Sequence, residues 1–406
     1  MRYEKKILLT LVLFLTIICK TNNIFAEANS IYCWNNESNL EKQVEEKNKS
    51  NINLQSGSAI LIEQNTGEIL YKHNIHEKLK PASVTKVMTI LLIMEEIDSG
   101  RISYTDKIPC TENAAAMGGS QIWLDVREEL TVDEMLKAIC VVSANDCTVA
   151  MAEYISGSQN SFVEKMNKKA KELGMNDTTF KNCHGIDEEG HVTSAYDISL
   201  MSRELLLKHP EVKKYTTIWM DTLREGKSQL VNTNKLIKNY KGATGLKTGS
   251  TSGALYNLSA SASRDNLSLI AVIMKAPTTK IRFNEAKMLL DYGFNNYTYK
   301  ELGKEGDVVA NVTINKGKIK MAEAVLEKNI GFIIERGTEN KIEQKLEIEE
   351  NINAPTYERQ KIGKISYKDN KGNVIESSII LKESIEKNNL NDIIRDIYRK
   401  YFKIFK

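Results

Sequence analysis

The sequence predicts an α/β domain with a helical insert, followed by a small β-rich domain and a C-terminal amphipathic helix. Short apolar runs typical of strands occur near residue 60 and again after residue 253, whereas helical periodicity dominates between them. Strands on both sides of a helical stretch form one mixed domain. Residues 301–385 consist of short β-rich runs broken by glycine and asparagine, which indicates a second, smaller unit.

Composition limits the possible classes of protein. The chain has 406 residues, which is enough for two to three domains, and 41% of them are hydrophobic. Lys and Arg number 56 against 53 Asp and Glu, so the net charge of +3 argues against nucleic acid as a partner. The histidines form no HExxH-like ligand set and no cysteine lies in a CxxC pair, so we expect no metal site and buried thiols.

The N-terminus is typical of an exported protein. Positive residues precede a short apolar stretch at residues 7–18, which Lys20 closes. Ala26 and Ala28 provide the small residues of a cleavage site, so we predict a signal peptide over residues 1–28. An uncleaved membrane helix is the alternative, but the apolar stretch is short for one.

The first structured element is expected after a flexible lead-in, because residues 29–55 are rich in Asn, Glu, Lys and Ser. Apolar runs at 58–63 and 68–71 flank an Asn-Thr-Gly turn and predict a β-hairpin. Pro81 then opens a helix, and Ser161 is a candidate cap for a later one.

The rest of this domain, which we place at residues 56–300, follows the same periodicities. Its other predicted elements are mostly helical structure over 131–208, strands over 254–261 and 267–275, and a helix over 280–290.

The last 21 residues, 386–406, predict an amphipathic helix that lies on a membrane surface. Apolar residues recur at helical spacing: Leu390, Ile393, Ile394, Ile397, Tyr401, Ile404 and Phe405. Basic residues gather on the other face: Arg395, Arg399, Lys400, Lys403 and Lys406. These charges forbid a bilayer-spanning helix but suit an interfacial one. The alternative is a helix packed on the protein's own β domain.

The first chemical motif is Ser83-Val-Thr-Lys86. Residues three apart share a helix face, so the lysine amine can reach the serine hydroxyl. A serine hydroxyl needs an adjacent base, and Lys86 can serve once burial or a second cation lowers its pKa. Backbone N–H groups at a helix start can also stabilise an oxyanion. Alone, the motif is equally typical of an ordinary surface helix.

The second motif, Ser143-Ala-Asn145, lies between two apolar helical stretches. An inter-helix turn would present both side chains, Ser143 to relay a proton and Asn145 to hold a substrate amide. Simple capping of the next helix is the alternative.

The third motif is Lys247-Thr248-Gly249, just before a predicted strand. Lys247 could be the second cation, Thr248 can bond a carboxylate, and Gly249 lets a peptide lie along the strand. A surface turn is the alternative. The three motifs carry more weight as an ordered set, because penicillin-binding proteins and class A β-lactamases share this trio.

The sequence resembles the low-molecular-mass penicillin-binding proteins of the D-alanyl-D-alanine carboxypeptidase family. The resemblance spans residues 56–300 and rests on these segments: 81–86, 142–146, 182–187, 232–236, 244–249 and 289–294. The resemblance implies a β-lactamase/transpeptidase-like catalytic domain that needs no metal or organic cofactor. It also implies removal of the terminal D-Ala from peptidoglycan stem peptides, inhibition by β-lactams, and a location on the outer face of the membrane or in the wall.

The resemblance also implies a role for each site residue. Ser83 is the nucleophile, Lys86 its base, and Ser143 and Lys247 shuttle protons. Asn145 orients the peptide, Thr248 meets the terminal carboxylate, and the backbone N–H groups of Ser83 and Ser250 form the oxyanion hole.

Three other functions remain open. A class A β-lactamase carries a deacylating Glu in an E-x-x-L-N context, and no such motif lies between Asn145 and Lys247. A D,D-endopeptidase would use the same residues. A non-catalytic penicillin-binding scaffold at the membrane is the third.

Overall fold

The computed structural model describes residues 52–338, 341–370 and 372–402. The predicted signal peptide and residues 29–51 of the predicted lead-in lie outside the described residues.

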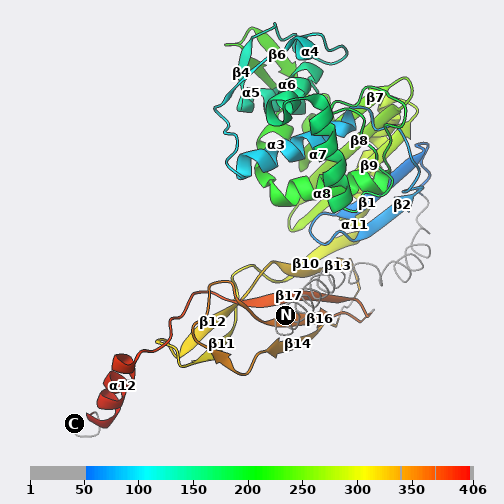
Figure 1. Cartoon of the computed structure of the whole chain (residues 1–406). Helices are drawn as coiled ribbons and strands as arrows, with labels where there is room; N and C mark the ends of the chain where they lie inside the picture. The colour runs from blue at the N-terminus through cyan, green and yellow to red at the C-terminus, as the bar shows by residue number, and fades with distance from the viewer. Residues whose placement is uncertain (1–51, 339–340, 371, 403–406) are drawn as a thin grey trace, which may run out of the picture.

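A five-stranded antiparallel sheet forms the base of the first domain (Figure 1). Its strands, in the order β2-β1-β9-β8-β7, are β2 (Ile69–His73), β1 (Ser58–Glu63), β9 (Leu267–Ala276), β8 (Leu255–Arg264) and β7 (Ala243–Thr251). The predicted hairpin is confirmed as β1 and β2. Since β1 also pairs with β9, the start of the domain closes against its end.

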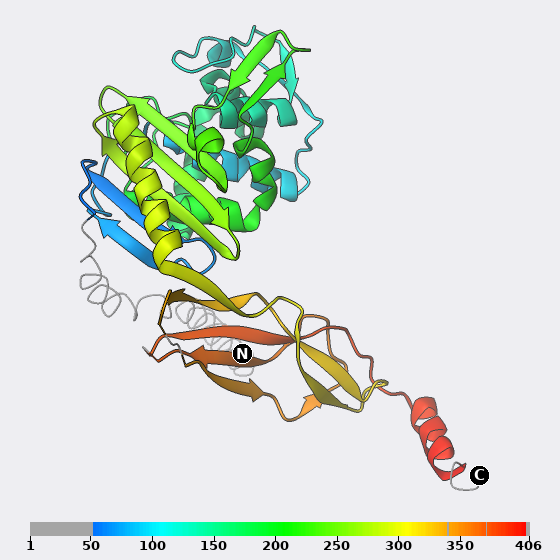
Figure 2. The same cartoon turned by 180° about the vertical axis from the view of Figure 1, so that it is seen from behind.

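The two faces of the sheet are both buried, because successive side chains of a strand point in opposite directions. On one face Ile60 and Ile62 join the core beneath the helical insert. On the other face Ala59 and Leu61 join a second core under α11 (Thr279–Asn296). Figure 2 shows α11 lying along this outer face.

The helical insert lies between β2 and β7 and covers the first face. Its long helices are α3 (Lys86–Asp98), α5 (Val132–Val141), α6 (Asn145–Ser156), α7 (Gln159–Glu172) and α8 (Ala195–Lys208). Its short elements are η1 (Ala82–Thr85), β3 (Lys107–Pro109), α4 (Glu112–Ala115), β4 (Glu129–Thr131), η2 (Pro210–Val212), α9 (Lys213–Thr216), β5 (Met220–Leu223), β6 (Ser228–Val231) and α10 (Leu236–Asn239).

N-capping residues set where helices of the insert begin. Thr131 and Glu134 form a capping box at α5. The cap predicted at Ser161 is wrong: Ser158 is the N-cap of α7, and its hydroxyl accepts from the Ser161 N–H at 3.2 Å. The prediction of mostly helical structure over 131–208 is confirmed by α5, α6, α7 and α8. Residues 173–194 between α7 and α8 are irregular, and Gly174 at φ +73° lies near the start of this segment.

The second domain begins as α11 ends. β10 (Tyr297–Gly303) follows directly and pairs with β13 (Ile330–Glu335). A six-stranded sheet has the order β14 (Glu343–Ile348), β16 (Lys361–Lys368), β17 (Val374–Leu381), β12 (Met321–Leu326), β11 (Val308–Asn315) and β15 (Ile352–Asn353). These strands bury a separate apolar core. The predicted combination of an α/β domain and a β-rich domain is therefore confirmed.

The chain continues into α12 (Leu390–Phe402), which projects from the far end of the β-rich domain (Figures 1 and 2). Leu390, Ile393, Ile394 and Tyr398 are exposed on it. Among the described residues, no helix combines the length and apolar character required to span a bilayer.

Candidate active site

The first motif lies where a tight turn becomes a helix. Ser83 is in the 3₁₀ turn η1, and Lys86 is the first residue of α3. The prediction that Pro81 opens a helix is confirmed, and the helix starts with one 3₁₀ turn, which was not predicted. The Thr85 hydroxyl supports this turn by donating to the Ala82 carbonyl at 2.8 Å.

The Lys86 amine is completely buried and has three oxygen neighbours. Its Nζ lies 3.0 Å from Ser83 Oγ, 2.6 Å from Asn145 Oδ1 and 2.7 Å from the His184 carbonyl oxygen. The first two motifs therefore meet at one nitrogen atom.

The electrostatic environment favours a neutral Lys86. Burial lowers the pKa of Lys86 well below its usual range, and the positive charge of Lys247 lowers it further. Burial likewise lowers the pKa of Lys247 to about 7. The third motif is also close to the first, because a Cβ at Gly249 would lie 2.8 Å from the Ser83 backbone nitrogen.

Ser143 lies in the turn between α5 and α6 with φ +68°, a left-handed conformation that a serine rarely adopts. Its Oγ is buried and has no hydrogen-bond partner among the described residues. A buried hydroxyl without a partner is costly, so this atom is free to bond a group that enters the site.

Asn145 is the first residue of α6 and connects the motifs to a neighbouring loop. Its Oδ1 accepts from Lys86, while its Nδ2 donates to the Gly118 carbonyl at 2.7 Å. Next to it, buried Asp146 accepts the backbone N–H groups of Ile122 and Leu124. Hydrogen bonds therefore join the loop at residues 118–124 to both Asn145 and Asp146.

The third motif lies on β7, an edge strand of the sheet. Lys247 Nζ donates to the Thr248 carbonyl at 3.0 Å, and Thr248 Oγ1 donates to Thr233 Oγ1 at 2.7 Å. At Gly249 a Cβ would lie 2.8 Å from the backbone nitrogen of Ser83, so only glycine allows this approach. Ser250, the next residue, is exposed.

Three contributors to the site were not predicted as functional residues. The His184 carbonyl binds Lys86, and Gly185, at φ +91°, packs so closely that a Cβ would lie 2.0 Å from the Ala82 oxygen. Buried Arg282 of α11 donates to the Gly249 carbonyl at 3.2 Å. The segment 182–187 was part of the resemblance, but the role of its backbone could not be predicted, because a contact made by a backbone carbonyl does not depend on the type of side chain.

Two family profiles together match most of the chain. The D-alanyl-D-alanine carboxypeptidase family matches residues 43–278, and the C-terminal domain of penicillin-binding protein 5 matches residues 297–387. D-alanyl-D-alanine carboxypeptidase DacF of Bacillus subtilis is 46% identical over 345 residues, which cover 84% of this chain and 88% of that protein. DacD of Escherichia coli is 30% identical over 356 residues, which cover 85% of this chain and 90% of that protein.

Solved structures share the fold. Penicillin-binding protein 5 from Haemophilus influenzae is 29% identical with a TM-score of 0.70, covering 83% of this chain and 99% of that one. Penicillin-binding protein D2 from Listeria monocytogenes in its ampicillin-bound form is 30% identical with a TM-score of 0.56. The match covers 60% of this chain and 99% of that one. The chain therefore belongs to the D-alanyl-D-alanine carboxypeptidase family of serine-type hydrolases, whose β-lactam-binding members are penicillin-binding proteins.

Proposed function

We propose that this carboxypeptidase releases the terminal D-Ala of peptidoglycan stem pentapeptides through an acyl-enzyme on Ser83, with Lys86 as the base. The hydrogen bonding of Lys86 carries this proposal. A neutral amine has two hydrogens and one lone pair. When the two hydrogens go to Asn145 Oδ1 and the His184 carbonyl, the lone pair is left for the Ser83 hydroxyl at 3.0 Å.

Acylation then proceeds by proton transfer and attack. The Ser83 hydroxyl gives its proton to Lys86 Nζ as Oγ attacks the carbonyl carbon of the penultimate D-Ala. The backbone N–H groups of Ser83 and Ser250 would bind the developing oxyanion. Close contact between Gly249 and the Ser83 nitrogen supports this pairing, because it brings the strand carrying Ser250 beside the nucleophile.

The leaving amine must receive a proton as the peptide bond breaks. Ser143 Oγ is suited to relay it, since this buried oxygen has no other partner among the described residues. Lys247, with its pKa near 7, can exchange protons with the relay. Water then attacks the acyl-enzyme by the reverse proton route and frees Ser83.

The substrate peptide would lie along β7. This strand is at the sheet edge, so an extended peptide can pair with it. The Thr248 hydroxyl and the Lys247 ammonium would meet the terminal carboxylate, and Asn145 would orient the stem peptide through the remaining Nδ2 hydrogen.

The cellular setting is also part of the proposal. Residues 1–28 would direct export and be removed, and residues 29–55 would lead into a catalytic domain at 56–300 and a β-rich domain at 301–385. The terminal segment 386–406 would attach the enzyme to the outer face of the membrane. The exposed apolar side chains of α12 support this attachment.

Release of D-Ala from a D-Ala-D-Ala pentapeptide, compared between the wild type and Ser83→Ala, tests the reaction. We expect release by the wild type and loss of more than about a thousandfold in the variant. Equal release by the two proteins would exclude Ser83 as the nucleophile. The same assay with a cross-linked dimer measures endopeptidase cleavage, which no observation here favours.

A further inference from the structure

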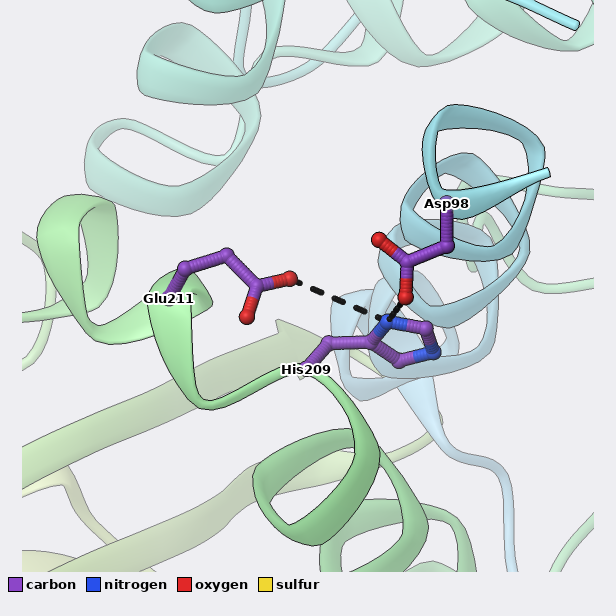
Figure 3. A group of neighbouring side chains, drawn as sticks. All are labelled: Asp98, His209 and Glu211. Atoms are coloured by element: carbon purple, nitrogen blue, oxygen red, sulfur yellow. Dashed lines mark ion pairs between the residues drawn. The ribbon is translucent and has the colours of Figure 1, made fainter. Parts of the chain in front are cut away.

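Three potential metal ligands meet at the end of α3 opposite to the nucleophile. Asp98 is the last residue of α3, His209 is the C-cap of α8, and Glu211 lies in η2 (Figure 3). One ligand atom from each lies within 4.8 Å of the other two, and no other group of this kind occurs in the part of the chain that the structure describes.

The His209 ring is buried, with 4% of the residue exposed, and its Nδ1 has no hydrogen-bond partner among the described residues. Asp98 Oδ2 lies only 2.8 Å from Nδ1, but it is not positioned for a hydrogen bond. His76 and Asp177 show the contrast, because the same two atom types at 2.8 Å do form one. This geometry is expected when two ligand atoms bind the same cation, because each lone pair then points at the cation and not at the other ligand atom.

The electrostatics of this corner favour a cation. Among the described residues, the carboxylates of Asp98 and Glu211 have no lysine or arginine within ion-pair distance. His209 Nδ1 lies 2.8 Å from Asp98 Oδ2 and 3.8 Å from Glu211 Oε1. Asp98 and His209 also lie at the C-termini of α3 and α8, where helix dipoles place partial negative charge.

We propose that Asp98, His209 and Glu211 bind a divalent transition-metal ion, and that Zn²⁺ fits best. One imidazole and two carboxylates are a donor set that zinc accepts, whereas Mg²⁺ and Ca²⁺ prefer oxygen alone. Bonds of about 2.0–2.2 Å in a tetrahedral site place neighbouring ligand atoms about 3.4 Å apart. The observed 2.8 and 3.8 Å lie on either side of that value. Water would complete the coordination on the solvent side.

This ion would be structural. It would tie the end of α3 to the α8–η2 corner, about 18 Å along the helix from Lys86. It would therefore stabilise the insert without taking part in acylation. The sequence has no compact motif for such a site, because Asp98 is far in the chain from the His209-Pro-Glu211 segment.

Zinc titration of untagged, chelator-stripped protein by calorimetry tests the proposal. We expect one equivalent to bind and the melting temperature to rise. Asp98→Asn and Glu211→Gln alter exposed side chains, so they should fold, but each should weaken zinc binding by at least about tenfold. His76→Asn is the matched control for a histidine–aspartate pair and should bind zinc like the wild type.

Two further readouts complete the test. Co²⁺ should give intense visible bands of a tetrahedral site in the wild type and weak ones in Asp98→Asn, while penicillin labelling of Ser83 stays the same in all proteins. The absence of stoichiometric zinc binding would overturn the proposal. So would zinc affinity that is unchanged in Asp98→Asn and Glu211→Gln, or equally reduced in His76→Asn.

Discussion

At the scale of single residues, Lys86 must be both buried and uncharged. A free lysine is protonated at neutral pH, but burial and the nearby charge of Lys247 lower the pKa of Lys86. Burying this amine costs desolvation free energy, but burial also favours the neutral form, which can act as a base. A perturbed pKa at a site with this geometry is typical of catalysis.

Lys86→Arg tests this role, because arginine keeps its proton and cannot accept another. We expect the rate of acylation by a chromogenic β-lactam to fall by about a hundred- to ten-thousandfold. Stopped-flow acylation measures the rate, and circular dichroism checks that the variant folds. An acylation rate within threefold of the wild type would show that another group takes the proton.

The pH dependence of acylation follows from the same two lysines. Acidification protonates Lys86 and removes its lone pair, so the rate should fall on the acid side, with a midpoint well below the usual lysine pKa of 10.5. The positive charge of Lys247 holds the pKa of Lys86 down, so Lys247→Gln should move this midpoint to higher pH. Acylation rates across pH for both proteins, with exposed Lys280→Gln as control, measure the shift. A midpoint that does not move would contradict the coupling.

At the scale of elements, the sequence predicts what local periodicity and turn chemistry determine. The 58–63 and 68–71 runs form a hairpin because two apolar runs flank an Asn-Thr-Gly turn. The 3₁₀ start of the nucleophile helix was missed, because it depends on contacts with Gly185 and Gly249 from distant segments. The cap at Ser158 was missed because Ser161, three residues later, has equally suitable chemistry.

The same limit applies to the site. Ser83, Lys86 and Asn145 were predicted from side-chain type and lie within hydrogen-bond reach of one another through Lys86. The His184 carbonyl and Arg282 were not predicted, since one acts through the backbone and the other belongs to a helix on the opposite face of the sheet.

The contact between β7 and the nucleophile turn gives a prediction at this scale. In Gly249→Ala the added Cβ would meet the Ser83 and Val84 nitrogens and the Pro81 oxygen at 2.8–2.9 Å, so the strand must move away. A displacement of about 1 Å should cost about a hundredfold in acylation rate.

Gly118→Ala is the control for this substitution, because a Cβ there meets nothing within 4 Å, although its carbonyl contacts Asn145. The acylation rates of both variants, compared with the wild type, test whether the reaction needs this close approach. If Gly249→Ala and Gly118→Ala acylate equally fast, the close approach of β7 is not needed for the reaction.

At the scale of the whole molecule, the active site and the helix proposed to attach the protein to the membrane lie far apart. The active site lies in the first domain, and α12 projects from the far end of the second (Figure 1). The β-rich domain would therefore act as a spacer that holds the catalytic domain away from the membrane surface.

Truncation before Leu390 tests this arrangement. We expect the shortened protein to lose binding to vesicles that contain anionic lipid, because it lacks the apolar and basic faces of the helix. Its acylation by penicillin should not change. Co-sedimentation measures binding, and equal binding by the truncated protein would place the membrane contact elsewhere.

Mass spectrometry of the benzylpenicillin adduct tests the central claim most directly. The account predicts one covalent adduct per chain, located on Ser83, absent in Ser83→Ala, and long-lived because the chain has no E-x-x-L-N deacylation motif between Asn145 and Lys247. An adduct on another residue, or rapid turnover of penicillin without an accumulated adduct, would contradict it.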